Sequence, residues 1–514
     1  MEEQQLNNNF SIPRRQSPIA IFLIVQKLIE QIIRQFWPIL LVVVLNNFDF
    51  QTRSSAVGED PYLTRILFFI GGLSAIGSII AYFKFYYYIK DDEFIIEKGL
   101  FNKTKINLPF DRIQTINFEQ NLIHQAFNVV SLEIDSAGSN QKEISLQAIR
   151  RKEAEAIRAF IMTEKAKLIT TDQEIETVVN ETQEESTDLL MQLSPFDLLK
   201  IGISQNHIRG LGIIIGFGFW MFQTLEDFFP DYQQGDNIAD YFIEDLGFGH
   251  ILYFSTYLIF ALIVCSVLIS LVMTIFQYFG LAFFRSEIGF KVRSGLFTKR
   301  EASANIHKIQ LIRWEDSILK RLFGIFQLGL FQASSAAVNT RQAISVPGCY
   351  AHQINTVRAT YFPAEQYLNY SIHGISSLII GRRVLYLGGI PLAILLINAY
   401  LNQSIPLAVL AFLWPVFIYF TSKIFHKNWK FHLSEAGILT EHGILGTQFT
   451  LLKWYKVQAV KTRQSIYQRR HDVADLYFYT AAGSVKIPYI PLEKAQKITN
   501  YVLYKVEVDN RSWM

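Results

Sequence analysis

Cysteine is nearly absent from this chain, and metal-binding spacings of cysteine and histidine are missing. Only Cys265 and Cys349 occur among the 514 residues, which excludes a disulfide framework and a cysteine-based metal cluster and favours core or lipid-facing thiols. The ten histidines show no metal-ligand spacing, because His426, His432 and His442 have no carboxylate or cysteine at helical reach. We expect these three to be ordinary surface side chains near a membrane, and we predict no metal and no cofactor.

Catalytic motifs are missing as well. The sequence contains no nucleophile elbow, no phosphate-binding loop and no paired-carboxylate arrangement. Four glycines between positions 210 and 218 lie inside an apolar run, where close helix packing is the usual role of glycine. The formal net charge of +3 gives no reason to expect a nucleic-acid partner. The sequence therefore predicts a protein that is not an enzyme.

Apolar residues, by contrast, are abundant. They make up 50% of the chain, and phenylalanine alone occurs 42 times, which is more than a soluble globular protein usually carries. Crossing a ~30 Å hydrocarbon core takes about 20 apolar residues; five runs are clear candidates, and a sixth is marginal because Pro38 interrupts it. The six predicted spans, in three pairs, are Phe36–Phe48, Leu63–Tyr88, Leu211–Phe229, Leu246–Phe284, Val384–Leu401 and Ile405–Phe425.

Charge is distributed unevenly between these runs and predicts their orientation. Residues 226–245, between the third and fourth spans, carry seven acidic residues and no lysine or arginine. Residues 285–321 carry nine basic residues against four acidic ones, and residues 423–470 carry nine against two. Because basic segments stay in the cytoplasm, we expect the N-terminus and the segment after each pair of spans to face the cytosol.

Three landmarks recur with constant spacing in the strand-rich segments that follow the paired spans. They are a turn glycine, the aliphatic residue of a basic–aliphatic–glutamine triplet fourteen positions later, and a cluster of small residues another twenty-four positions on. In the three segments the landmarks stand at Gly99, Ile113 and Ala137, at Gly295, Ile309 and Ala333, and at Gly443, Val457 and Ala481. Such constant spacing indicates a repeated structural unit.

Each repeat also begins with a proline-led stretch ahead of its first span, at Pro18, Pro195 and Pro363. After Pro18 the polar residues recur with a period near 3.5, which favours an amphipathic helix lying in the headgroup layer of a membrane. A helix packed on its own domain is the alternative for all three stretches.

The first strand-rich segment predicts a meander that a helix closes. Its predicted strands are Phe94–Lys98, Thr104–Phe110, Ile113–Glu119, Val129–Asp135 and Glu143–Leu146. A helix over Arg151–Lys165 has an apolar face that can cap a small sheet, and the third segment repeats this face with Ala495, Ile498, Val502 and Leu503. About eighty residues of strands with one terminal helix suggest a small barrel or sandwich.

A family resemblance rests on the segment Leu108–Ile116, followed by Gln120–Leu122 and Ile134–Gly138. This pattern resembles the bacterial pleckstrin-homology-like (PH-like) domain of YdbS/YdbT-type membrane proteins. In that family such domains follow paired membrane helices, often in tandem. The resemblance implies a multipass α-helical membrane protein with three small cytosolic PH-like β-barrel or sandwich domains, each ending in a helix. The later segments depart from the pattern at 304–305 and 452–453, where other residues replace Leu-Pro.

These signals divide the chain into seven segments. The acidic stretch 166–193 cannot bury enough apolar area to fold alone, and we predict a mobile tether there. The predicted segments are an N-terminal interfacial helix with the first membrane pair at 1–88, PH-like domain 1 at 89–165, the acidic linker at 166–193, the second membrane pair at 194–284, PH-like domain 2 at 285–362, the third interfacial helix and membrane pair at 363–427, and PH-like domain 3 at 428–508.

The leading hypothesis is a scaffold in the bacterial cytoplasmic membrane whose PH-like domains bind anionic lipids or a protein partner. That partner could be another membrane protein of the same family, and a homo-oligomer is also open. Each basic residue near an anionic surface contributes about 1 kcal/mol, although the same residues could serve only to fix topology. The six candidate residues are Arg293, Lys299, Arg300, Lys423, Lys427 and Lys430.

Two other functions stay open. A transporter or channel would form a substrate pathway from the six helices, but such a pathway needs ionisable residues at mid-depth, and the predicted spans offer almost none. A role in envelope stress or antimicrobial resistance is implied only by the kind of protein that the chain resembles.

Overall fold

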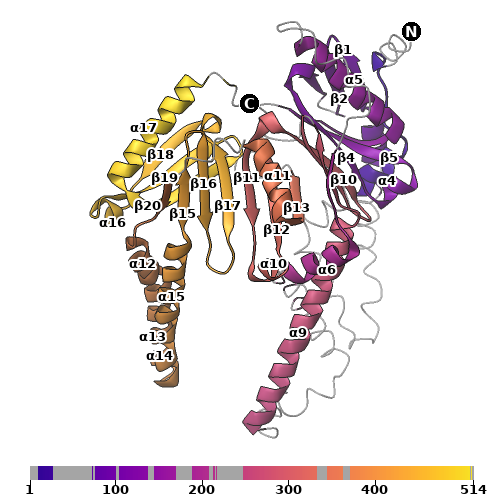
Figure 1. Cartoon of the computed structure of the whole chain (residues 1–514). Helices are drawn as coiled ribbons and strands as arrows, with labels where there is room; N and C mark the ends of the chain where they lie inside the picture. The colour runs from indigo at the N-terminus through magenta and orange to yellow at the C-terminus, as the bar shows by residue number, and fades with distance from the viewer. Residues whose placement is uncertain are drawn as a thin grey trace, which may run out of the picture.

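Three domains of the same build follow one another along the chain, and two long helical stems project from one side of the row (Figure 1). The structure is a computed structural model. It describes residues 10–26, 76–99, 103–136, 144–169, 188–205, 247–286, 288–332, 344–362, 371–403 and 405–509, together with the isolated residues 72, 207, 212, 214, 216 and 511.

Each domain consists of two antiparallel sheets and a closing helix. Domain 1 contains β1 (Tyr86–Lys90), β2 (Glu93–Lys98), β3 (Thr104–Pro109), β4 (Ile113–Gln120), β5 (Val129–Ser136), β6 (Ile144–Arg150) and α5 (Arg151–Ile169). Domain 2 contains β7 (Asp188–Gln192), β8 (Ala282–Ser286), β9 (Gly289–Ser294), β10 (Lys299–Asn305), β11 (Ile309–Glu315), β12 (Ile325–Gln332), β13 (Ile344–Tyr350) and α11 (Ala351–Tyr361). Domain 3 contains β14 (Ser371–Gly374), β15 (Lys430–Leu433), β16 (Gly437–His442), β17 (Gln448–Lys453), β18 (Ala459–Arg463), β19 (Val473–Thr480), β20 (Gly483–Pro491) and α17 (Leu492–Val508).

The five strands predicted for the first unit are confirmed as β2 to β6, with ends that differ by a few residues. The closing helices are confirmed as well. In α17 the side chains of Ala495, Ile498 and Val502 are buried against the sheets, whereas Leu503, which we placed on the same face, is 45% exposed. Leu503 lies one position beyond Val502, and this rotation turns it away from the core.

The first two sequence landmarks lie at the two ends of the first sheet in each domain. The turn glycine links two strands; Gly295, at φ 111°, donates its N–H to the Phe279 carbonyl at the end of a membrane stem, at 3.0 Å. The basic residue of the triplet ends a single 3-10 turn that passes the chain to the second sheet, at η1 (Phe110–Arg112), η4 (Ile306–Lys308) and η7 (Trp454–Lys456). The aliphatic residue that follows this turn is buried in every domain. The third landmark is described only in domain 3, as the turn at Ala481 between β19 and β20.

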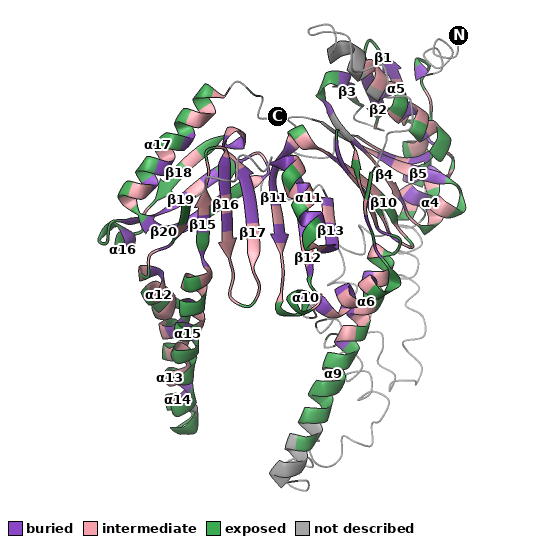
Figure 2. Cartoon of the chain, viewed as in Figure 1, coloured by how far each residue is buried: buried purple, intermediate pink, exposed green. Residues whose placement is uncertain are grey.

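Three of the six predicted spans fall on helices that are long and apolar enough to cross a membrane, namely Thr256–Tyr278, Leu378–Leu401 and Ala408–Asn428. The first lies within α9 (Gly247–Tyr278). The other two form the second stem, built from α12 (Leu378–Arg383), η6 (Val384–Gly389), α13 (Ile390–Leu401), α14 (Ile405–Ala411) and α15 (Leu413–Asn428). The indole N–H of Trp414 donates to the Leu387 carbonyl at 2.8 Å and joins the two halves of this hairpin. Both stems expose apolar side chains along their length (Figure 2).

The other predicted spans need separate comment. Phe36–Phe48 and nearly all of Leu211–Phe229 lie outside the described residues. Two predicted spans ran too far at their C-terminal ends. Tyr86–Tyr88, assigned to the second span, belong to β1, and Phe283 and Phe284, assigned to the fourth, belong to β8. The cause is that the strands after both helices are themselves largely apolar, and single polar residues such as Lys84 and Gln277 do not mark where the helix ends.

Each membrane segment is inserted into a domain rather than placed before it. β7 pairs with β8 although 89 residues separate their facing ends, Gln192 and Ala282, and β14 pairs with β15 in the same way. In domain 1 the bridge between Arg14 and Tyr87 occupies the equivalent place. The predicted linker 166–193 therefore contains β7 of domain 2, and the predicted third membrane segment 363–427 contains β14 of domain 3. Both edge strands are short and include polar residues, so the sequence pattern did not indicate them.

The proline-led stretches are helices whose apolar side packs on the same domain, so the alternative to an interfacial helix fits the described residues better. α6 (Pro195–Ser204) begins at a Ser194 capping box and buries Leu198 and Ile201 in the core of domain 2. After Pro18 the helix buries Ala20 and Leu23 against domain 1. In the third stretch α12 begins at Leu378, and Pro363 lies outside the described residues.

The three domains are joined into one row by shared sheets. β4 of domain 1 pairs antiparallel with β10 of domain 2, and β11 of domain 2 pairs antiparallel with β17 of domain 3. Two seven-stranded sheets result, each of which contains strands of two domains. The core around Trp314 contains residues of both domain 2 and domain 3, including Leu451. The sequence predicted separate modules on tethers, and this edge-to-edge joining was not foreseen.

Candidate functional site

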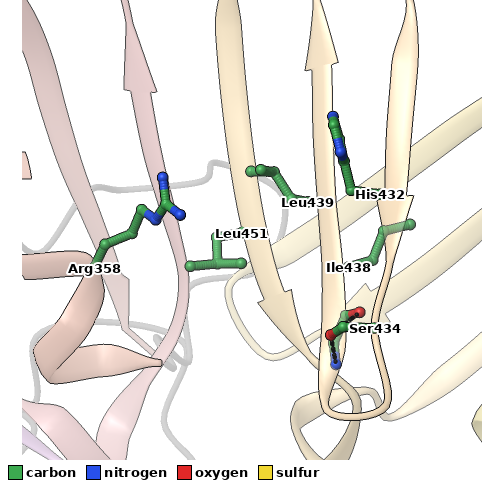
Figure 3. Close-up of a pocket in the computed structure, with 7 residues that line it drawn as sticks. Arg358, His432, Ser434, Ile438, Leu439 and Leu451 are labelled. Atoms are coloured by element: carbon green, nitrogen blue, oxygen red, sulfur yellow. Dashed lines mark hydrogen bonds between the residues drawn. The ribbon is translucent and has the colours of Figure 1, made fainter. Parts of the chain in front are cut away.

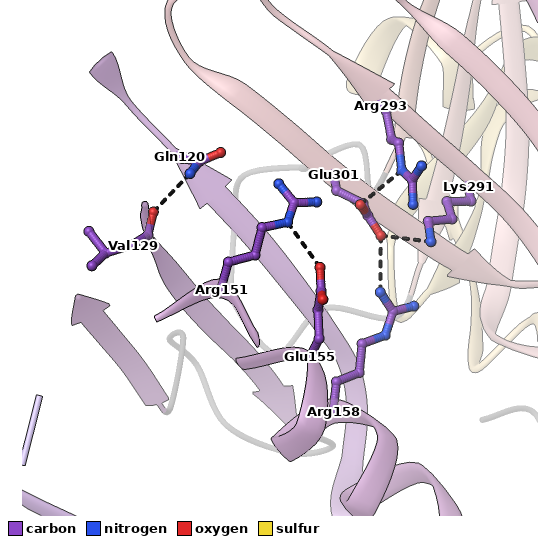
Figure 4. A network of polar contacts seen from close by, with 8 residues as sticks. All are labelled: Gln120, Val129, Arg151, Glu155, Arg158, Lys291, Arg293 and Glu301. Carbon is purple, nitrogen blue, oxygen red and sulfur yellow. Dashed lines mark hydrogen bonds and ion pairs between the residues drawn. The ribbon is translucent and has the colours of Figure 1, made fainter. Parts of the chain in front are cut away.

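The seam between domains 1 and 2 holds three of the six candidate basic residues, Arg293, Lys299 and Arg300. Arg293 belongs to an ion network around Glu301 of β10 (Figure 4). The Glu301 carboxylate accepts from Lys291 at 2.7 Å, from Arg293 at 2.9 Å and from Arg158 of α5 at 3.0 Å. Burial opposes the charge of Glu301, but the hydrogen bond and charge of Lys291, with the charges of Arg293 and Arg158, outweigh burial and lower its pKa. This ion network ties the helix of domain 1 to the sheet of domain 2.

Arg300 closes the same seam from the exposed side. Its Nη2 lies 3.0 Å from Oε1 of Glu119, the residue directly opposite on β4. Lys299, also exposed, faces Gln120 in the same register. The structure therefore brings Arg293, Lys299 and Arg300 together and uses two of them to hold carboxylates at a domain seam. Cross-strand pairs of this kind fix register and orientation.

The other three candidate residues lie together at a different place, where the second stem enters domain 3. Lys423 and Lys427 stand four residues apart on α15, and Lys430 begins β15. All three side chains are exposed, and within the described residues no ion pair joins any of them to a carboxylate. They form a basic collar, Lys423, Lys427 and Lys430, around the domain end of the stem. Sequence reasoning placed all six residues in one surface, whereas the structure places them in two.

Exposed apolar side chains stand on α10, the β16–β17 turn and α16, three short elements that lie toward the side of the domains from which the stems project (Figure 1). We call this group the apolar rim; its members are Ile318 and Leu322 of α10 (Ile318–Leu322), Leu445 of the β16–β17 turn and Ile466 of α16 (Ile466–Arg469). Their exposed fractions run from 56% to 79%. Each helix starts at a serine N-cap, Ser317 or Ser465, which holds the first apolar residue outward. The sequence analysis did not predict the rim, although a serine followed by isoleucine stands at the same distance from the turn glycine in domains 2 and 3.

A small cavity of about 100 Å³ lies between domains 2 and 3 (Figure 3). Arg358 of α11 reaches it from domain 2, and His432, Ser434 and Leu439 line it from domain 3. Its volume suits a few water molecules rather than a metabolite, since ligand pockets usually measure several hundred Å³. We do not assign it a ligand.

The histidines are more buried than the sequence suggested. Burial is the main cause that lowers the pKa of His432, and the positive charges of Lys430 and Arg358 lower it further. The Glu441 carboxylate, 3.7 Å away, acts in the opposite direction but does not outweigh them. His442 stacks on Trp429 with ring centroids 5.6 Å apart, and burial lowers its pKa as well. Within the described part of the chain, no group of three or more potential ligands could hold a metal. His432 and His442 are therefore partly buried in domain 3, whereas we expected them on the surface.

A second basic group, not foreseen from the sequence, surrounds Tyr455 at the 3-10 turn of domain 3. Lys456 Nζ lies 4.9 Å, Lys453 Nζ 5.5 Å and Arg511 Cζ 4.2 Å from the centre of its ring. Burial lowers the pKa of Lys453 to about 8, with help from Arg511, and burial together with Lys453 and Arg511 lowers that of Lys456 to about 8. Lys456 donates to the His307 carbonyl of domain 2 at 2.5 Å.

Comparison with known proteins agrees with this geometry. The family model described as "Bacterial PH domain" matches residues 38–165, 239–362 and 381–506. The chain is also 26% identical over 325 residues to the UPF0699 transmembrane protein YdbT of Bacillus subtilis (strain 168); this alignment covers 63% of the chain and 63% of that relative. No solved structure matches.

Each of the three matched ranges covers most of one domain described above, together with all or part of the membrane segment inserted into it, and omits the short strand or bridge before that segment. Together they cover most of the sequence, and the described stems supply helices long enough to cross a bilayer. The protein is thus a membrane protein with three PH-like domains, and the chain belongs to the bacterial PH domain family.

Proposed function

We propose that this protein is a non-enzymatic scaffold of the bacterial cytoplasmic membrane, anchored by six helices in three pairs. Its N-terminus and the joined PH-like domains face the cytosol, where they bind anionic headgroups at the bilayer surface. A role in envelope stress or antimicrobial resistance would follow from such a surface. The observation that carries the proposal is the pairing of strands on either side of each membrane segment.

Strand pairing supports an even number of crossings in each repeat. The chain leaves domain 2 after α6 and returns at β8, which lies beside β7 in the same sheet. A sheet cannot be divided by a bilayer, so both ends of the insertion are on one side. With α9 as one crossing, residues 206–246 would supply at least one more. In domain 3 both helices of the pair are described, and they form a hairpin.

The joined sheets support a single orientation for all domains. Because β4 pairs with β10 and β11 with β17, the three domains cannot lie on opposite sides of the membrane. The excess of basic residues in 285–321 and 423–470 then favours the cytosolic side. Domain boundaries follow from the same argument: each domain includes the short strand or bridge before its membrane segment.

Lipid binding is proposed for the basic collar and the apolar rim together. Lys423, Lys427 and Lys430 sit where the second stem meets domain 3, at the depth of phosphate groups, and each would contribute about 1 kcal/mol near an anionic surface. Rim side chains such as Ile466 could enter the headgroup layer beside them. Arg293 and Arg300 already form ion pairs with Glu301 and Glu119. We therefore expect the seam between domains 1 and 2 to contribute less to lipid binding than the basic collar.

The test measures how closely the rim approaches the bilayer. Full-length protein with a fluorophore on Leu445→Cys is reconstituted into phosphatidylcholine vesicles with and without phosphatidylglycerol, each containing headgroup-quencher lipids. Quenching should be several-fold stronger in the anionic vesicles, and K423Q/K427Q/K430Q should remove most of that difference. A matched control neutralises three exposed lysines elsewhere, Lys103, Lys105 and Lys497. Equal quenching in both vesicles, or equal loss in the control, would contradict lipid binding by the collar.

A transporter or channel is the alternative that the vesicle system can also address. Substrate-dependent flux through the same reconstituted protein would favour that reading over a scaffold. In α9 the buried polar side chains Ser266, Ser270 and Thr274 carry hydroxyl groups rather than ionisable ones. The ionisable groups beside the stems are His207, 3.1 Å from Ser270, and Arg383, which donates to Ser422 at 3.2 Å. Both lie toward the domain ends of the stems, whereas a substrate pathway needs such groups at mid-depth.

A further inference from the structure

One sheet edge of domain 3 has the form of a seam but no domain beside it. In domains 1 and 2 the first strand of the second sheet, β4 or β11, pairs with the last strand of the first sheet of the following domain. The equivalent strand of domain 3 is β18. Within the described residues no strand pairs with its outer edge, and four of its five residues are exposed. An exposed strand edge is a ready template for pairing with another chain.

The two existing seams have one register. Glu119 and Glu315 each stand six positions after the buried aliphatic landmark, and they face Arg300 and Gln448, which each stand five positions after the turn glycine. The same count in domain 3 leads to Arg463. A strand that joined β18 in this register would therefore place its fifth residue after the turn glycine opposite Arg463, and its seventh opposite Lys461.

The chemistry of β18 selects the incoming strand. Lys461 and Arg463 are exposed on one face of β18, and the strand contains no acidic residue. At the first seam the same position pair is an ion pair, Arg300 with Glu119 at 3.0 Å. Acidic side chains on an incoming strand would reproduce that contact with the signs exchanged.

A second copy of this chain does not offer such a strand. The corresponding strand, β3, has its outer edge unpaired within the described residues, but it would place Thr104 opposite Arg463. Lys103 and Lys105 flank Thr104, and both are exposed. Lys105 already faces Glu97 of its own domain at 3.8 Å. Opposite Lys461 the register places Ile106, so neither residue of β3 that faces the two cations carries a charge. The lack of a carboxylate at these two positions disfavours a head-to-tail filament of this protein.

We propose that β18 is the docking edge for a fourth PH-like domain, carried by a different polypeptide whose incoming strand has acidic side chains five and seven positions after its turn glycine. The partner extends the shared-sheet row by one domain through backbone hydrogen bonds, and Arg463 and Lys461 select it. The proposal rests on the proposed scaffold function only in that both chains lie on the same face of the membrane.

The test converts β3 of a second copy into such a strand. Two full-length copies, both carrying Cys265→Ser, are produced together. One carries Val460→Cys on β18, and the other carries Asn107→Cys, the position that the register places opposite Val460. The second copy is made with T104E/I106E, which places carboxylates opposite Arg463 and Lys461, or without these substitutions. Disulfide formation in isolated inverted membranes under mild oxidant is then timed.

We expect the cross-link to form at least tenfold faster with the T104E/I106E copy than with the unchanged β3. Moving the cysteine from Val460 to the exposed Gln496 of α17 should abolish the cross-link and serves as the control. Equal rates with and without the acidic residues would overturn the proposal in favour of a second copy. Absence of the cross-link in both cases would overturn it by showing that β18 accepts no strand. Neither outcome would change the result expected for the membrane orientation or for lipid binding, so failure of this proposal is distinguishable from failure of the proposed function.

Discussion

At the scale of single residues, the turn glycines show how a short sequence signal encodes a backbone requirement. Gly295 has φ 111°, and a Cβ there would lie 2.0 Å from the Thr298 carbonyl oxygen. That conformation is outside the range of side-chain-bearing residues. The tight turn lets Leu296 donate its N–H to Phe276 of α9 at 3.1 Å, so the turn contacts the stem directly. The repeat of glycine in the sequence was therefore a sound guide to structure.

Gly295→Ala should destabilise domain 2 by about 1–3 kcal/mol, because the strained backbone and the carbonyl clash both have to be relieved. The measurement is pulse proteolysis of the detergent-solubilised protein in urea. Gly324→Ala is the matched control: Gly324 has φ 65° and a Cβ there would meet nothing within 4 Å, so the loss should stay near 1 kcal/mol. Equal losses would show that the clash is not significant.

The lysines beside Tyr455 predict an unusual dependence of stability on pH. Burial holds the pKa of Lys453 and of Lys456 at about 8, against an ordinary value of 10.5. A lysine with a depressed folded pKa penalises folding while it is protonated, so the stability of domain 3 should rise as pH increases from about 8 to 10.5. Two such groups make the rise steep.

Lys453→Met should reduce this slope by more than half, since it removes one titrating group and relieves the repulsion that depresses the pKa of Lys456. Urea midpoints measured between pH 7 and pH 10 give the slope. Lys497→Met, at a largely exposed position on α17, should leave it as in the wild type. A wild-type midpoint that falls across this range would mean that neither lysine is buried as described.

At the scale of elements, the shared sheets and the inserted stems are the features that sequence patterns could not reveal. Strand identity in domain 1 was predictable because apolar alternation and turn residues are local signals. The pairing of β4 with β10 joins residues about 180 positions apart, and nothing local in Arg300 or Glu119 indicates such a contact. Likewise, β7 follows an acidic stretch and is separated from β8 by a membrane segment, which concealed its place in a sheet.

The candidate residues divide in the same way. Exposure of Lys423, Lys427 and Lys430 followed from their position after an apolar run, and the structure places them together. By contrast, the partners of Arg293 and Arg300 come from strand pairing, so the sequence could not show that carboxylates already occupy them. The apolar rim was missed because single exposed isoleucines and leucines do not stand out in a chain that is half apolar.

Glu301→Gln should weaken the seam between domains 1 and 2 by about 3 kcal/mol, because Arg158, Lys291 and Arg293 would lose the carboxylate that they share. Hydrogen exchange should then be faster in β4 and β10 while β18 to β20 stay protected. The matched control, Glu493→Gln, removes a fully exposed pair with Lys497 and should leave both the stability and the exchange as in the wild type. Unchanged exchange in both strands would show that the network does not hold the seam.

At the scale of the whole molecule, the row of domains and the stems form one mechanical unit. Each membrane insertion starts and ends in the same sheet or bridge, and each sheet at a seam belongs to two domains. A displacement of one stem is therefore transmitted to a shared sheet rather than absorbed by a linker. This arrangement would suit the platform that we propose, in which three domains are held at fixed spacing on a bilayer, and it supports the proposed even number of spans in each repeat.

The central claim, that all three domains lie on the cytosolic face because the stems are inserted in pairs, is tested most directly by cysteine accessibility. Single cysteines replace exposed residues of the three domains, Lys105, Lys299 and Gln496, in a Cys265→Ser background, and a membrane-impermeant maleimide is applied to intact cells and to inverted membrane vesicles. The account predicts labelling of all three positions in inverted vesicles and of none in intact cells. Labelling of any one of them from outside the cell would contradict it.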